Sequence, residues 1–143
     1  MTPVLADTAF LVALYRPSDR AHAAAWSYLR DHRHALATVA AVIVETCFFL
    51  APSSKLSLLS WLRKGAMSVF ETPVEAYAQL EITLRKYSDR DIDFADAALV
   101  WLANETGARS NILQFGTLRE QKLPNKSEQK QHRQDCHAQS DKG

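Results

Sequence analysis

The sequence is poor in cysteine, has no long hydrophobic run and carries no excess of one charge sign. Its two cysteines, Cys47 and Cys136, exclude a disulfide-rich scaffold and a four-cysteine zinc site. No stretch approaches the roughly 18 apolar residues of a membrane span, and Met1–Leu5 lacks the basic residues of a signal peptide. We therefore expect a cytoplasmic protein that makes no membrane contact.

The balance of charge limits how the chain can bind nucleic acid. Lysine and arginine total 17, and aspartate and glutamate total 16. This near-neutral balance excludes a broad electrostatic hold on nucleic acid, which needs a clustered positive excess. A local basic rim remains compatible with it.

Apolar residues become scarce after residue 113. The segment 114–143 holds five of them: Phe115, Leu118, Leu123, Cys136 and Ala138. So few cannot offset an ordering entropy of roughly 1–2 kcal/mol per residue. We predict a folded domain over 1–113 and a polar, disordered tail over 114–143.

Short apolar runs and helical patterns alternate along the first segment. The predicted strands are 3–7, 36–38, 67–70 and 110–113; the predicted helices are 8–15, 19–32, 40–51, 53–65, 73–87 and 93–105. Ser18, and Ser53 or Ser54, are predicted helix N-caps, and Gly107 is predicted to close the last helix. The alternation indicates an α/β domain with a mostly parallel sheet. In such sheets ligands bind outside the carboxyl ends of the strands.

Two acidic residues occupy unusual positions in the sequence. One follows a predicted strand, where a ligand site is expected, and the other lies in an apolar run, where burying a charge is unfavourable. Asp7 follows the first predicted strand, so it either lies in the ligand crevice or caps the helix that begins at Thr8. Glu45 lies in the apolar run 39–50, where a buried carboxylate needs a partner or a metal ion. The alternative is that the helix turns Glu45 toward water.

Asp93 and Asp96 fall at the N-cap and N3 positions of the last predicted helix. This spacing resembles a capping box, and acidic residues there also complement the helix dipole. If Asp7, Glu45 and Asp96 converged, their repulsion would favour a bound cation, and hard carboxylate oxygens suit Mg²⁺ or Mn²⁺. Such an ion can activate water for phosphodiester hydrolysis.

These residues carry a family resemblance. The segment around Asp7 (Val4-Leu-Ala-Asp-Thr-Ala-Phe-Leu), then Glu45 in an apolar helix, then the segment 93–103 around Asp96 together resemble a PIN domain, and VapC-type toxins of bacterial toxin–antitoxin pairs in particular. The match spans about residues 2–113, and the order and spacing of its short motifs are more specific than any one of them.

The resemblance implies a three-layer fold and a metal-dependent ribonuclease. It implies Asp7, Glu45 and Asp96 as catalytic residues and Mg²⁺ or Mn²⁺ ligands, with Asp93 in a supporting role and Thr8 holding a water or a phosphate. It also implies an RNA substrate, an antitoxin protein that blocks the groove, and a homodimer.

The end of the chain departs from the family pattern. Such domains commonly continue after the last strand with Thr-Thr-Asp, but here Leu113 is followed by Gln-Phe-Gly-Thr-Leu, and no acid occurs before Glu120. We expect that the fourth acid and the C-terminal strand are missing, as after a frameshift or an altered terminus. Activity would then be impaired.

Two other functions compete with a toxin ribonuclease. The missing acid favours a PIN-fold binding module with a weakened or inactive site. A phosphatase or phosphoacceptor of another α/β family is disfavoured, because the residue two beyond Asp7 is Ala9 and not a second acid. A zinc site at His22, His32 and His34 is disfavoured by their spacing.

Overall fold

The computed structural model describes residues 2–108 and 112–113 of the chain. Its strands form one sheet in the order β3-β2-β1-β4, and every neighbouring pair is parallel. The strands are β1 (Val4–Ala6), β2 (Leu36–Val39), β3 (Ser68–Phe70) and β4 (Ile112–Leu113). The predicted parallel α/β fold is confirmed. The predicted tail and the missing fourth acid lie outside the described residues.

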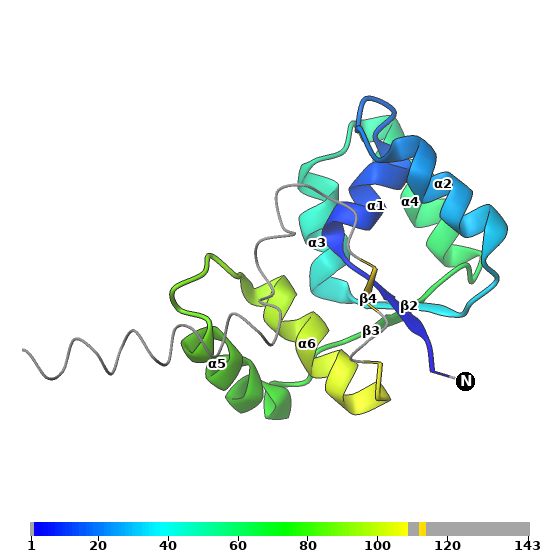
Figure 1. Cartoon of the computed structure of the whole chain (residues 1–143). Coiled ribbons are helices and arrows are strands. Elements are labelled where there is room, and N and C mark those ends of the chain that lie inside the picture. The colour runs from blue at the N-terminus through cyan, green and yellow to red at the C-terminus, as the bar shows by residue number, and fades with distance from the viewer. Residues whose placement is uncertain (1, 109–111, 114–143) are drawn as a thin grey trace, which may run out of the picture.

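Helices cover the sheet on both sides (Figure 1). They are α1 (Thr8–Tyr15), α2 (His22–Asp31), α3 (Ala40–Phe48), α4 (Pro52–Arg63), α5 (Tyr77–Lys86) and α6 (Phe94–Thr106), with a 3-10 turn η1 (Val74–Ala76) before α5. Helices α5 and α6 pack together on one side, and α1 packs with α2 and α4 on the other. Helix α3 packs against both α1 and α6 and so joins the two groups.

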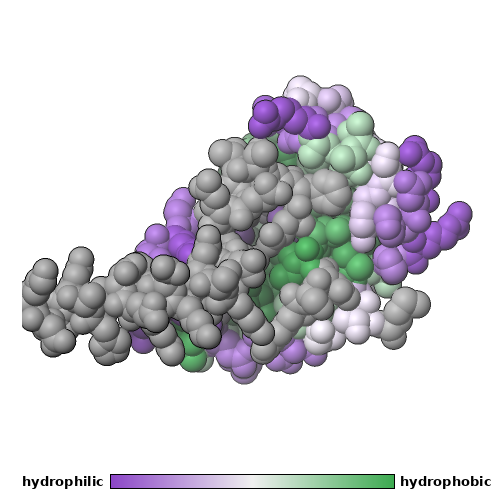
Figure 2. All heavy atoms as spheres, viewed as in Figure 1, coloured by the Kyte–Doolittle hydropathy of each residue, from purple (hydrophilic) through white to green (hydrophobic). Residues whose placement is uncertain are grey.

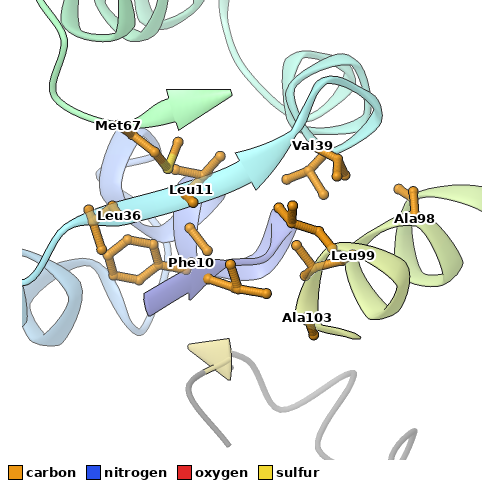
Figure 3. Packing of buried hydrophobic residues seen from close by; sticks show 14 of the residues in the cluster. Phe10, Leu11, Leu36, Val39, Met67, Ala98, Leu99 and Ala103 are labelled. Atoms are coloured by element: carbon orange, nitrogen blue, oxygen red, sulfur yellow. The ribbon is translucent and has the colours of Figure 1, made fainter. Parts of the chain in front are cut away.

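The core follows from the burial of the inner strands. Strands β1 and β2 are buried along their whole length, as expected for parallel strands covered on both faces, whereas the edge strand β3 is exposed. Figure 3 shows Phe10 and Leu11 of α1 and Leu99 of α6 packing around these strands. The apolar runs at both ends of the described chain therefore meet in one core.

The surface is polar over some helices and apolar near the sheet edge. Helix α2 buries only Ala25 and presents a hydrophilic outer face, whereas hydrophobic side chains gather near β4 (Figure 2). Ile112 and Leu113 of β4 are only half buried. None of the helices within residues 2–108 has the length and apolarity needed to cross a membrane.

The predicted helix starts at serine are wrong. Helix α2 begins at His22 with Ala21 as N-cap, because Asp19 instead accepts a hydrogen bond from the Ala21 amide at 2.8 Å within a preceding turn. Helix α4 begins one residue before Ser53, at Pro52, whose missing N–H suits the first helical position. Pro52 therefore opens α4, and α3 already ends at Phe48.

The remaining boundaries differ less from the prediction. Pro73 precedes a 3-10 turn, so the long predicted helix 73–87 is split into η1 and α5. Strand β4 confirms the second half of the predicted strand 110–113, whose first two residues lie outside the described residues.

Candidate active site

Asp7 joins the end of β1 to the start of α1. Its backbone is extended (φ −91°, ψ 174°), and its Oδ1 accepts a hydrogen bond from the Phe10 amide at 2.8 Å. The predicted N-cap role is confirmed. Asp7 is also only 7% exposed, and it lies at the carboxyl end of a parallel strand, where the positive end of α1 stabilises its charge. The N-cap of α1 therefore lies at the strand end where ligands bind in folds of this class.

Thr8 connects this junction to Glu45. The Thr8 hydroxyl is buried and donates to Glu45 Oε2 at 2.8 Å, which brings together residues 37 positions apart. Glu45 is half buried on α3, so it does not simply point into water. The resemblance implied a water or a phosphate at Thr8. In the structure the Thr8 hydrogen is donated to the neighbouring carboxylate.

Asp93 and Asp96 form the predicted capping box at the start of α6. Asp93 Oδ1 accepts from the Asp96 amide at 3.0 Å, and Asp96 Oδ2 accepts from the Asp93 amide at 3.1 Å. Figure 3 places Ala98, near the start of α6, by Val39 at the carboxyl end of β2. Helix α6 therefore starts near the carboxyl ends of the strands, where Asp7 also lies. Asp96 is half buried and Asp93 exposed.

The carboxylates offer the right donor chemistry for a hard divalent ion but no preformed cage. In the described part of the chain, no three Asp, Glu, His or Cys side chains form a group that could hold a metal ion. The three expected ligands are therefore not gathered into such a cluster. Mg²⁺ is commonly held by one or two carboxylates, with water or substrate phosphate completing the coordination. Asp7, which directly precedes Thr8, and Glu45, which accepts from the Thr8 hydroxyl, are two carboxylates that suit this smaller requirement.

The sequence does not single out Thr38, yet the structure places it at the same junction. Thr38 lies in β2, is wholly buried, and its hydroxyl donates to the Ala6 carbonyl at 2.7 Å. Ala6 directly precedes Asp7. The only signal in the sequence is one hydroxyl residue within an otherwise apolar predicted strand.

The histidines lie in other surroundings. His22 Nδ1 lies 2.7 Å from the Ala13 carbonyl, and the His32 ring stacks on Tyr28 with centroids 4.4 Å apart. Neither contact belongs to the junction of Asp7, Thr8 and Glu45.

The fold resembles that of a solved toxin. The crystal structure of VapC20 from Mycobacterium tuberculosis, described as a sarcin-ricin loop cleaving toxin, superposes with a TM-score of 0.67 at 20% sequence identity. The chain shares the fold of VapC20. The match covers 72% of this chain and 82% of VapC20, and it confirms the PIN-like, three-layer arrangement expected from the sequence. No protein-family model and no curated protein matched the chain.

Proposed function

We propose that the protein is a metal-dependent endoribonuclease that acts as the toxin of a toxin–antitoxin pair. The observation that carries the proposal is the Thr8–Glu45 hydrogen bond, which links Glu45 of α3 to the residue that directly follows Asp7 at the carboxyl end of β1. The fold shared with VapC20, a sarcin-ricin loop cleaving toxin, supports the same conclusion.

Asp7, Glu45 and Asp96 are the residues that would hold Mg²⁺ or Mn²⁺. When bound, the ion would lower the pKa of a coordinated water and offset charge on a phosphoryl oxygen. Asp7 accepts from the Phe10 amide and Asp96 accepts from the Asp93 amide, each through one carboxylate oxygen, which fixes the position of that side chain. Thr8 fixes Glu45 in the same way. Asp93 supports Asp96 through their capping box.

Without a cation, the three carboxylates are expected to stay apart. Carboxylates within a few ångström disfavour one another's charge unless a cation lies between them. In the structure Asp7 and Asp96 each accept from a backbone amide, and Glu45 accepts from the Thr8 hydroxyl. We infer that a divalent ion supplies the attraction that draws them together.

The expected partners are RNA, an antitoxin protein and a second copy of the chain, all in the cytoplasm. Helices α3 and α4 and the C-cap residue of α3 expose large apolar side chains, which favours a protein partner on this part of the surface. These side chains are Val44, Phe48, Phe49, Leu56 and Leu59, with exposed fractions from 50% to 82%.

A binding module with an inactive site is the second candidate. It is favoured because no three-ligand group occurs in residues 2–108 and 112–113, and because no acid follows Leu113 before Glu120. Such a protein would bind a partner without cleaving RNA.

Incubation of the purified protein with total RNA distinguishes the two. We expect cleavage with Mg²⁺ or Mn²⁺ and none with a chelator. Asp7→Asn should abolish cleavage and keep the fold, because asparagine caps a helix about as well as aspartate but lacks its charge. Asp31→Asn, which changes an exposed acid on α2, is the matched control and should cleave normally.

Three results would overturn the assignment as a metal-dependent nuclease. The first is an unaltered chain that cleaves no RNA with Mg²⁺ or Mn²⁺. The second is cleavage that persists in the chelator. The third is an Asp7→Asn protein that cleaves RNA as fast as the unaltered chain.

A further inference from the structure

A buried hydroxyl fixes the peptide just before Asp7. Thr38 is 0% exposed, and its Oγ1 donates to the carbonyl oxygen of Ala6 at 2.7 Å, across 32 residues of sequence. A buried carbonyl needs a hydrogen-bond donor, and this hydroxyl supplies one. The bond therefore links β2 directly to the residue from which Asp7 extends.

The position of this bond in the sheet is informative. In the parallel pair β1 and β2, Val4 pairs with Leu36 and Leu5 pairs with Ala37. Thr38 itself pairs with Val69 of β3 on its other side. Its hydroxyl thus carries the connection between β1 and β2 one residue further, to the end of β1.

We propose that Thr38 is a positioning residue for the Asp7 carboxylate. The peptide before Asp7 is held by Thr38, and the Asp7 side chain is held by the Phe10 amide. With both attachments in place, the Asp7 carboxylate is fixed next to Thr8, whose hydroxyl holds Glu45. The consequence for catalysis rests on the proposed nuclease function; the structural role of Thr38 does not.

Substitutions that differ in the hydroxyl alone isolate this role. Thr38→Val keeps the branched shape and removes the donor, whereas Thr38→Ser keeps the donor. Thr38→Ala and Thr38→Ser differ only in the oxygen, so this pair provides the same comparison if the valine variant does not fold. Thr106→Val is the matched control, because Thr106 also donates to a backbone carbonyl at 2.7 Å, but at the far end of α6.

The first measurement is amide hydrogen exchange of Phe10 in the full chain, which reports on the Asp7 cap without any activity. We expect exchange to rise about tenfold in Thr38→Val and Thr38→Ala relative to Thr38→Ser and Thr106→Val. Loss of a partner that orients a metal ligand typically weakens metal affinity or activity about 10–100-fold. Mn²⁺ affinity should therefore fall by at least about tenfold, and kcat on RNA should fall likewise with KM unchanged.

The outcomes separate the two proposals. Equal Phe10 exchange and equal Mn²⁺ affinity in the valine and serine variants would overturn the role of Thr38. A fall in Thr106→Val as large as that in Thr38→Val would do the same, because it would show a general stability effect. An unaltered chain that cleaves no RNA would end the nuclease proposal, while the Phe10 exchange would still decide the role of Thr38.

Discussion

Thr8 is the residue through which the first helix reaches Glu45, and its hydroxyl is the contact to alter. Thr8→Val keeps the buried, branched side chain and removes the donor to Glu45 Oε2. We expect a folded protein whose RNA cleavage is slower by about 10–100-fold, the range found when an orienting partner of a metal ligand is lost. Rates of cleavage at saturating Mg²⁺ measure this.

Serine is the matched change at the same position. Thr8→Ser retains the hydroxyl and should stay within about threefold of the unaltered rate. A serine variant as slow as the valine variant would show that the methyl group matters and that the hydrogen bond does not.

The hydroxyl of Tyr15 makes the stability of the folded protein depend on pH under alkaline conditions. Its ring packs edge-on against Trp26 and Trp61, and burial raises the pKa of its hydroxyl from 10.0 to about 12. The folded protein therefore keeps this proton at pH values where the unfolded chain loses it. The stabilising contribution is complete below about pH 10 and is lost as the pH rises toward about 12.

Tyr15→Phe removes this titration. We expect the free energy of urea unfolding to fall less between about pH 9 and about pH 11 in the phenylalanine variant than in the unaltered chain. Equal falls in the two proteins would assign the alkaline loss to other groups.

At the scale of elements, helix α4 has one fully buried side chain, Leu58, beside the partly buried Trp61 and Leu62. Leu58 is 0% exposed and Leu56, on the same helix, is 71% exposed. Truncating a buried leucine to alanine costs about 2–5 kcal/mol of unfolding free energy, whereas an exposed one stays within about 0.5 kcal/mol. Urea unfolding of Leu58→Ala and Leu56→Ala should therefore differ by at least about 1.5 kcal/mol.

A small loss in both variants would contradict the packing of α4 on the core. A large loss in Leu56→Ala would instead mean that the exposed face of α4 is covered in solution. Sedimentation tests whether a second copy of the chain covers this face, because a dimer would have twice the mass of a monomer.

Some element ends follow from the sequence and others do not. The capping box at Asp93 and Asp96 and the left-handed Gly107 (φ 71°) that closes α6 were both predicted, because each depends on residues within one turn. Ser18 was a wrong cap, because Asp19 formed a competing turn. A local sequence pattern indicates which residues could cap a helix, but the hydrogen bonds of neighbouring side chains determine which residue does.

At the scale of the whole molecule, the alternation of apolar runs sufficed to predict a parallel α/β fold. Asp7 and Glu45 were placed in one site through the family resemblance, and their link through Thr8 was not predicted. The Thr38–Ala6 bond was not predicted either. Both bonds join residues more than 30 positions apart, so no local pattern carries them.

The division into a domain and a polar tail can be tested by deletion. Strand β4 ends at Leu113, and residues 114–143 bring five apolar side chains. We expect a chain ending at Leu113 to unfold within about 0.5 kcal/mol of the full chain in urea, as measured by circular dichroism. A loss above about 2 kcal/mol would show that the tail contributes to the folded domain.

The place of β1 in the sheet also affects how the protein is made. Its neighbours are β2 and β4, and Leu5 pairs with Ile112 near the other end of the described chain. While the ribosome is still adding residues, β1 can pair with β2 but lacks its second neighbour until Leu113 has emerged. The nascent protein therefore spends most of its synthesis with an open strand edge, which is a surface that chaperones can shield and that other unfinished chains can join.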